Sequence, residues 1–247
     1  MDAAPGPEPR RCRDAIRGGR PLSVDLPALL LSLKLSAATA ALLLAIGLPL
    51  GAWLAFSRAP WKPVVEAVVA LPIVLPPTVL GFYVLVLLGP NGPAGRLLDS
   101  LFDIRLPFTF EGLLVASVLY SLPFAVQPFA ASFARVPRRL LEASATLGAS
   151  PFSTFRRVVL PISVPGIVAG LVLAFAHTVG EFGVVLMVGG NIPGVTRTVS
   201  IAIYDDVQAL DYGAAGGTSL VLLLFSFAVL TVTYALRGKV ASPWPAE

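Results

Sequence analysis

The 247-residue sequence offers little from which a catalytic site could be built, since it contains one cysteine, one histidine and only 13% charged residues. The single Cys12 excludes an intrachain disulfide and a cysteine-cluster metal site. Zinc hydrolase sites and Cys/His catalytic pairs need more of these residues than the chain holds. A Gly-x-Ser-x-Gly nucleophile elbow is also missing. We therefore expect no catalytic residue, no metal site and no enzymatic activity.

A phosphate-binding loop is absent as well, because that motif needs Gly, four residues, Gly-Lys and then Ser or Thr. The only Gly-Lys pair is Gly238-Lys239, which is followed by Val240 and lacks a glycine at position 233. The chain is not expected to bind ATP in this manner, or any other cofactor. The net charge of +4 is modest and gives no reason to expect a nucleic-acid partner.

Apolar residues are abundant: 56% of the chain is hydrophobic and the mean hydropathy is +0.83. Such a composition is typical of an integral membrane protein, with the lipid bilayer as its surroundings. Five stretches are long enough to cross a bilayer as helices, namely residues 28–56, 64–89, 111–134, 162–188 and 217–236. Backbone groups must be paired within lipid, and no barrel-like alternation is present. The predicted fold class is all-α, a polytopic transmembrane helical bundle with five spanning helices.

The distribution of charge predicts the orientation of this bundle. Arginine and lysine gather after the first and third apolar stretches and at the C-terminus, whereas the two other connections carry more aspartate. By the positive-inside rule the N-terminus faces outward and residues 142–161 face the cytoplasm. Five arginines before residue 21 argue against this orientation and leave the side of the tail open. We expect a disordered tail over residues 1–25, a transmembrane domain over 26–238 and a short tail over 239–247.

A polar segment over residues 137–161 separates the third and fourth apolar stretches. It is predicted to form two short helices: the first stops at Gly148, and the second starts with Ser150 as N-cap and Pro151 as the first helical residue. Leu160-Pro161 is expected to end the second helix at the membrane. An amphipathic interfacial helix is the simpler alternative for such a loop.

Within this segment Glu142-Ala143-Ser144 is followed after three residues by Gly148, and after nine more by Val158-x-Leu160-Pro161. This spacing resembles the signature of the membrane subunits of bacterial type I ABC importers, with Ser144 in place of the usual alanine and Val158 in place of isoleucine. The resemblance extends over residues 28–236. It implies that cytoplasmic coupling helices dock onto a separate ABC ATPase, which binds the ATP. The implied coupling residues are Glu142, Ala143, Ser144, Gly148, Phe152, Leu160 and Pro161.

A second region narrows the resemblance. Gly180-Glu181-Phe182-Gly183, Gly190-Asn191-Ile192-Pro193-Gly194 and Leu71-Pro72 through Val79 resemble the permeases of molybdate importers and, less closely, those of sulfate importers. The resemblance implies import of molybdate across the bacterial inner membrane by a homodimer of permeases, two ATPases and a periplasmic oxyanion-binding protein. Tungstate and sulfate remain alternatives.

Several polar residues in the apolar stretches are candidates for lining a translocation pathway: Thr78, Ser117, Ser121, His177, Thr178, Glu181 and Asn191. His177 and Glu181 are four residues apart and are expected on one helix face. Prolines are expected to break the second, third and fourth helices and to free backbone groups for an oxyanion. Arg197 is the candidate for contact with the binding protein. Ordinary helix packing is the alternative for each of these residues.

Two other classes of protein remain to be weighed. A secondary transporter or channel would use broken helices without an ATPase, but the sequence shows no repeated pair of broken segments in corresponding halves. An intramembrane enzyme would need a nucleophile with its base, or a metal cluster. Neither alternative accounts for the spacing in residues 142–161.

Overall fold

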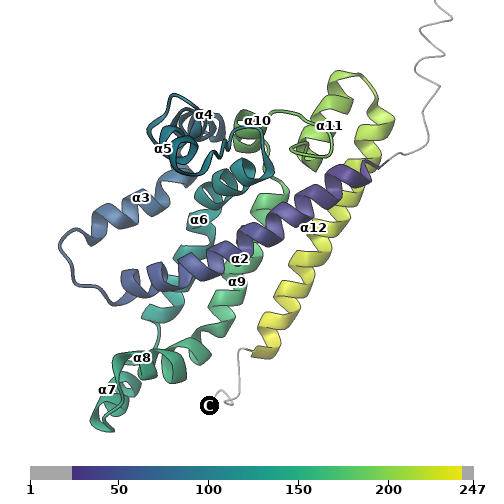
Figure 1. The fold of residues 1–247 in the computed structure, drawn as a ribbon. Coiled ribbons are helices and arrows are strands. Elements are labelled where there is room, and N and C mark those ends of the chain that lie inside the picture. Colours follow the sequence, from purple (N-terminus) through teal and green to yellow (C-terminus); the bar gives the residue numbers. More distant parts are fainter. Residues whose placement is uncertain (1–23, 241–247) are drawn as a thin grey trace, which may run out of the picture.

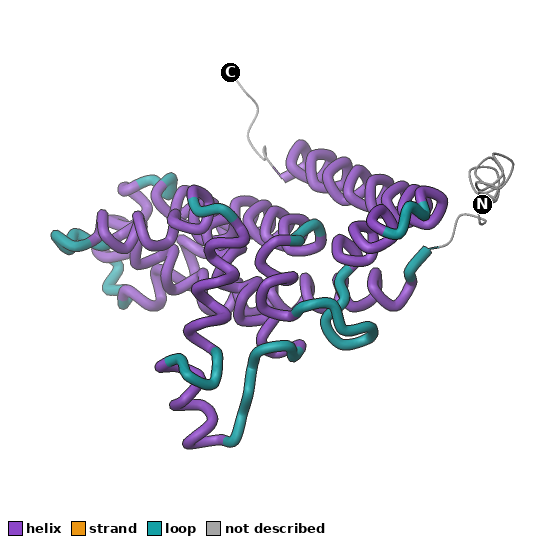
Figure 2. The backbone as a smooth tube through the Cα atoms, turned by 90° about the horizontal axis from the view of Figure 1, so that it is seen from above, coloured by secondary structure: helices purple, strands orange, loops and turns teal. Residues whose placement is uncertain are grey.

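The computed structural model describes residues 24–240, with side chains placed as far as residue 231, and this part of the chain is helical without strands (Figure 1, Figure 2). The tails predicted over 1–25 and 239–247 lie almost entirely outside the described residues. The elements are α2 (Leu26–Phe56), α3 (Lys62–Val74), α4 (Pro77–Leu88), α5 (Pro93–Phe102), α6 (Phe110–Ala134), α7 (Arg138–Thr146), α8 (Pro151–Thr154), the π-helical turn η1 (Phe155–Val159), α9 (Leu160–Val179), α10 (Gly183–Gly189), α11 (Val199–Gln208) and α12 (Tyr212–Val240).

The centre of the fold is the packing of α2, α6 and α9 along one another. Phe129 of α6 is fully buried at this contact. A Cβ atom added at Gly51 would lie 3.0 Å from the Cβ of Phe129, and one added at Gly170 would lie 2.8 Å from its ring. Both Gly-x-x-x-Gly pairs, beginning at Gly47 and Gly166, therefore serve helix packing within one subunit.

The second apolar stretch, predicted to span the membrane over residues 64–89, is not one continuous helix. It consists of α3 and α4, which are bent by 115° at a short break. Leu75 and Pro76 have extended backbone there, because Pro77 lacks an amide hydrogen and restricts the residue before it. The prediction that prolines break this helix is confirmed at Pro76 and Pro77, whereas Pro72, also predicted to break it, lies inside α3.

The third helix, by contrast, is not broken by its prolines. Pro123 and Pro128 both lie inside the continuous α6, as Pro165 lies inside α9. A membrane helix tolerates such prolines when neighbouring helices help to satisfy the backbone groups that the prolines leave unpaired. A proline alone therefore does not determine whether a helix continues at these positions, and the packing of neighbouring helices contributes.

The predicted end of the polar segment at Leu160-Pro161 is also wrong. Residues Pro151–Val179 form one continuous helix, and the amide of Leu160 donates to the carbonyl of Phe155, five residues earlier. This wider π turn accommodates the proline ring that would clash within an α-helical turn. The fourth span, predicted to reach residue 188, instead stops at Val179, and a short connection leads to α10.

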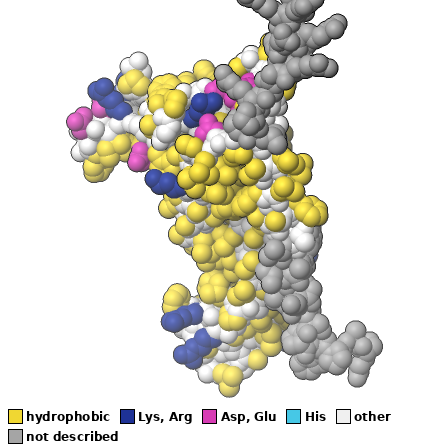
Figure 3. Space-filling view, turned by 90° about the vertical axis from the view of Figure 1, so that its right-hand side faces the viewer, with side chains coloured by type: hydrophobic (Ala, Val, Ile, Leu, Met, Phe, Trp, Pro, Cys, Tyr) yellow, Lys and Arg dark blue, Asp and Glu magenta, His cyan; other side chains and the backbone are white. Residues whose placement is uncertain are grey.

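Four helices are long and apolar enough to cross a membrane, and a fifth span results if the bent α3–α4 pair is counted as one. Only 22–50% of the most apolar window of each long helix is buried within the chain. Figure 3 shows hydrophobic side chains in a broad band between two ends where charged side chains gather. The chain is therefore a multi-pass membrane protein, and α7 and α8 lie at the end opposite to α5, α10 and α11 (Figure 1).

Candidate functional site

The polar segment of residues 137–161 contains the two predicted helices, the second of which continues into α9, and we call this segment the hairpin because its two arms meet at a turn. Gly148 makes the turn with a left-handed φ of 74°, which a residue with a side chain adopts only at a cost. Ser150 caps α8 by accepting a hydrogen bond from the amide of Ser153. The hydroxyls of Ser144 and Thr154 lie 2.8 Å apart and join the two arms. The hairpin is therefore a defined surface element.

The surface of the hairpin carries apolar side chains that the rest of the chain does not cover. Leu147 is 87% exposed and Phe152 is 73% exposed. The predicted coupling residues Glu142, Ala143 and Gly148 are exposed beside them. Leu160 and Pro161 lie further along the helix, beyond η1. Sequence reasoning missed Leu147, although an apolar residue directly before the Gly148 turn was a signal for it.

A cleft of about 480 Å³ separates the hairpin from the connection between α2 and α3. Phe56, Ser57 and Arg58 line one side of it, and Arg138, Leu141 and Glu142 line the other. The basic connections that the charge pattern assigned to one side of the membrane are thus neighbours in space.

A second group of predicted residues forms a buried polar cluster between α6 and α9. The hydroxyl of Ser121 lies 3.0 Å from Nδ1 of His177 and 2.9 Å from the hydroxyl of Thr178. The Thr178 hydroxyl donates to the carbonyl of Ala174. The imidazole stacks on Phe124, with ring centroids 4.0 Å apart. These contacts hold His177 between aromatic rings and pair its Nδ1 with Ser121.

Glu181 does not share a helix face with His177, so that expectation is wrong. Helix α9 ends at Val179, and Glu181 follows in the connection to α10. Its side chain is only 4% exposed, and neither carboxyl oxygen has a hydrogen-bond partner among the described residues. The buried hydroxyl of Ser117 on α6 adjoins this carboxyl and interacts with it, although neither group forms a hydrogen bond of good geometry. Because α9 ends at Val179 with Gly180 as its C-cap, the helical spacing that would have aligned the two side chains does not reach Glu181.

The breaks in the second and fourth apolar stretches meet in space. A Cβ atom added at Gly183, the first residue of α10, would lie 2.8 Å from the Cβ of Pro77 and 3.4 Å from the amide nitrogen of Thr78. Thr78 itself is exposed at the start of α4. Thr78 and Glu181 thus belong to one junction of two interrupted helices, which the sequence did not reveal.

Asn191 and Arg197 lie in the loop between α10 and α11, at the end of the molecule opposite the hairpin (Figure 1). Arg197 Nη2 is 3.4 Å from an Asp205 carboxyl oxygen, and its Nε is 3.9 Å from Asp25. Asn191 donates to the same Asp205 oxygen. Burial raises the pKa of Asp206, and the charge of Arg197 opposes this shift. Arg197 is therefore engaged with two carboxylates and joins α2, α11 and the loop before α11.

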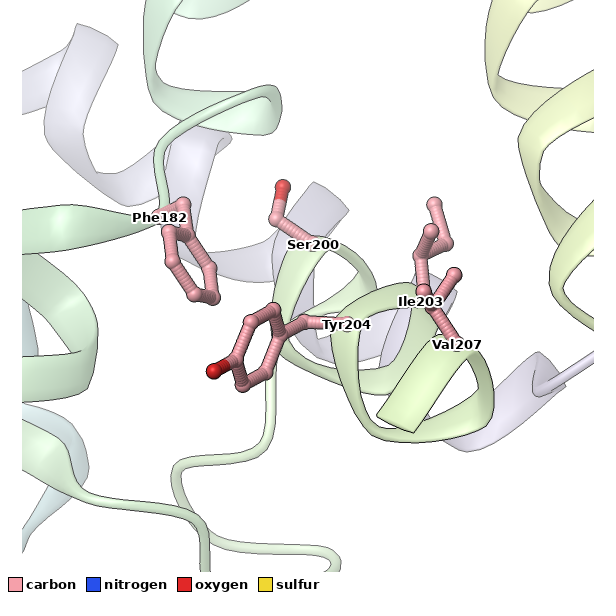
Figure 4. Close-up of a pocket in the computed structure, with 5 residues that line it drawn as sticks. All are labelled: Phe182, Ser200, Ile203, Tyr204 and Val207. Atoms are coloured by element: carbon pink, nitrogen blue, oxygen red, sulfur yellow. The ribbon is translucent and has the colours of Figure 1, made fainter. Parts of the chain in front are cut away.

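An apolar groove of about 380 Å³ lies beside α11 (Figure 4). Phe182, Ser200, Ile203, Tyr204 and Val207 line it, and the rings of Phe182 and Tyr204 are 5.0 Å apart. Its lining residues carry two hydroxyl groups, those of Ser200 and Tyr204, and no cation. The chemistry of the groove therefore does not suit an oxyanion. Among residues 24–240, with side chains to 231, no group of three His, Cys, Asp or Glu side chains is placed to hold a metal ion.

Comparison with known proteins agrees with this architecture. The chain is 53% identical to the molybdenum transport system permease protein ModB of Azotobacter vinelandii, over 86% of this chain and 94% of that protein. It is 35% identical to the sulfate transport system permease protein CysT of Salmonella typhimurium, over 74% of this chain and 65% of that protein. The fold resembles a bacterial alginate ABC importer, with a TM-score of 0.72 at 18% identity, covering 88% of this chain and 80% of that one.

The MetNI methionine ABC transporter shares the fold at a TM-score of 0.67 and 18% identity, covering 86% of this chain and 94% of that one. Residues 47–242 match the family described as the binding-protein-dependent transport system inner membrane component. The chain therefore belongs to the family of inner-membrane components of binding-protein-dependent transport systems.

Proposed function

We propose that this chain is the permease subunit of an ATP-driven importer that carries molybdate across the bacterial inner membrane. The observation that carries the proposal is the 53% identity to a molybdenum permease along most of both chains. The sulfate permease of Salmonella typhimurium is more distant, at 35% identity over a shorter part of this chain. Sulfate and tungstate are the competing cargoes.

The hairpin is the proposed docking site for an ABC ATPase that hydrolyses the ATP. Exposed Leu147 and Phe152 supply apolar contacts of the kind that a protein groove covers. Phe152 belongs to the same continuous helix as the membrane-spanning residues up to Val179. A displacement of the hairpin by the ATPase is therefore carried along α9 to the junction beside Glu181.

Two copies of the chain and a periplasmic binding protein complete the proposed importer. Non-helical backbone at membrane depth must be covered by protein or by a water-filled cavity. The α3–α4 break leaves Val74, Pro76, Pro77 and Thr78 exposed in the single chain. A two-fold homodimer covers such a surface and places the pathway between the copies. The binding protein then delivers its oxyanion at the end that carries α5 and α11.

The test is uptake of radiolabelled molybdate by liposomes that contain the permease with its ATPase, with binding protein outside and ATP inside. We expect uptake to require both ATP and the binding protein. Excess sulfate should compete with molybdate only weakly. A version of the ATPase that binds but cannot hydrolyse ATP is the matched control and should abolish uptake. Uptake without ATP would contradict the proposal in favour of a secondary transporter, and a preference for sulfate would contradict the cargo.

A further inference from the structure

Glu181 is the one carboxylate of the described chain that is both buried and without a hydrogen-bond partner. Each of its two carboxyl oxygens has less than 1 Å² of accessible surface. None of the ion pairs among the described residues includes it. Burial of a polar group without a partner is unfavourable, and for a charged group strongly so. An explanation for this side chain is therefore needed.

The neighbourhood of Glu181 is otherwise well paired. Ser121 and Thr178 bond each other within the cluster between α6 and α9. Thr196 donates to the carbonyl of Gly189 and accepts from the amide of Ile192, which closes the loop after α10. The other buried side-chain oxygens without a hydrogen-bond partner belong to the neutral hydroxyls of Thr39, Ser117, Ser163 and Thr198, so Glu181 is the one carboxyl among them.

Glu181 also occupies a mechanical position in the fold. It lies in the short connection that interrupts the helical path from the hairpin through α9 to α10. Beyond it, α10 rests on α4 and α6 through glycines that leave no room for a side chain. A Cβ atom added at Gly81 would lie 2.8 Å from the Cβ of Met187, and one added at Gly189 would lie 2.4 Å from Leu113. Surfaces that fit this closely separate as units and do not deform gradually.

We propose that Glu181 is a coupling residue that opposes the closed contact of α10 with α4 and α6. In the closed arrangement its carboxyl is buried without a partner, and when α9 draws α10 away the carboxyl gains water or a donor. The unfavourable free energy of this burial is therefore present only in the closed state. It shifts the equilibrium between the closed and open arrangements toward opening. This inference rests on the proposed function, since it needs an ATPase that moves α9 through the hairpin.

A labelling experiment tests the movement directly and does not depend on the cargo. Val184→Cys, at the buried contact of α10 with α4 and α6, is placed in a Cys12→Ser chain that keeps Glu181 and is assembled with the ATPase, and its reaction with a small polar thiol reagent is timed at rest and during ATP turnover. Because the resting site is buried, we expect turnover to accelerate labelling roughly tenfold or more. Thr39→Cys is the matched control, because Thr39 is also fully buried but lies on α2. Its labelling should stay slow in both conditions, and an equal response of the two sites would overturn the proposal.

A second experiment separates coupling from a structural role. Glu181→Leu removes the buried carboxyl, so the thermal midpoint of the permease–ATPase complex should rise by about 2–4 °C while uptake per ATP hydrolysed falls several-fold. Glu181→Gln, which is neutral but still polar, should lie between Glu181→Leu and the wild type. A lower midpoint in both variants would show that Glu181 supports the fold, and a higher midpoint with unchanged uptake would show that it is not coupled. Either result overturns the inference, whereas failure of the wild-type complex to take up molybdate would instead reject the proposed function.

Discussion

The hydroxyl of Ser144 lies 2.8 Å from the hydroxyl of Thr154, and this pair ties α7 to α8 across the turn at Gly148. The two residues are ten positions apart, and the contact exists only because the chain reverses between them. A backbone bond from the amide of Ala149 to the carbonyl of Ser144 lies beside it. The hairpin can therefore transmit a push from a bound partner as one body.

The Ser144–Thr154 pair predicts a partial loss of coupling when it is removed. Ser144→Ala and Thr154→Val should each weaken the hairpin by about 1 kcal/mol, and the double variant should cost little more than either alone. We expect ATP hydrolysis to continue while molybdate uptake falls. Thr146→Val is the control, because the Thr146 hydroxyl bonds only to the carbonyl of Ala143 in its own helix. Additive losses in the double variant would show that the two hydroxyls act independently.

Gly148 predicts a distinction between backbone strain and contact with the ATPase. A Cβ atom at this position would meet no atom of the chain within 4 Å, so the direct cost of Gly148→Ala is the left-handed φ, about 1–2 kcal/mol. Asparagine tolerates this conformation better than most residues. We expect Gly148→Asn to retain uptake, and Gly148→Trp to insert and dimerise but to transport nothing. Normal uptake by Gly148→Trp would refute the docking role of the hairpin.

The junction of the two helix breaks predicts a sharp effect of a single methyl group. Gly183→Ala would place a Cβ 2.8 Å from that of Pro77 and should force α10 away from α4, which lowers the thermal midpoint and uptake together. Gly216→Ala is the matched control, because nothing lies within 4 Å of a Cβ there and the residue is inside α12. That control should be neutral, or stabilising by about 0.5–1 kcal/mol. Equal effects of the two substitutions would mean that the α4–α10 contact is loose.

The ion pairs of Arg197 distinguish two roles for this residue: it either holds the structure of its loop or contacts the binding protein directly. Because it pairs with Asp25 and Asp205, Arg197→Ala should lower stability by about 1 kcal/mol, and so should Asp205→Ala. If the ion pairs serve to position the loop, both variants weaken affinity for the binding protein to a similar extent. A loss of affinity in Arg197→Ala alone, measured by surface-based binding, would assign the guanidinium a direct contact with the partner.

The sequence predicted the membrane class and the hairpin well because both depend on local chemistry. Apolar length determines whether a helix can span lipid, and Gly148, Ser150 and Pro151 specify a turn and a cap through their own backbone preferences. Prolines were less informative. Pro77 begins a new helix whereas Pro123 and Pro128 lie within the continuous α6, which packs against α2 and α9.

The sequence by itself determined that the chain spans a membrane, that it carries no nucleotide-binding loop and that two helices meet at a turn around Gly148, since composition and spacing act locally. Only the tertiary structure decided which polar residues meet. It paired Ser121 with His177 across α6 and α9, ended α9 between His177 and Glu181, engaged Arg197 with two aspartates and brought the two helix breaks together. These relationships join residues far apart in the chain, and they are fixed by how the helices pack and not by the preferences of any one segment.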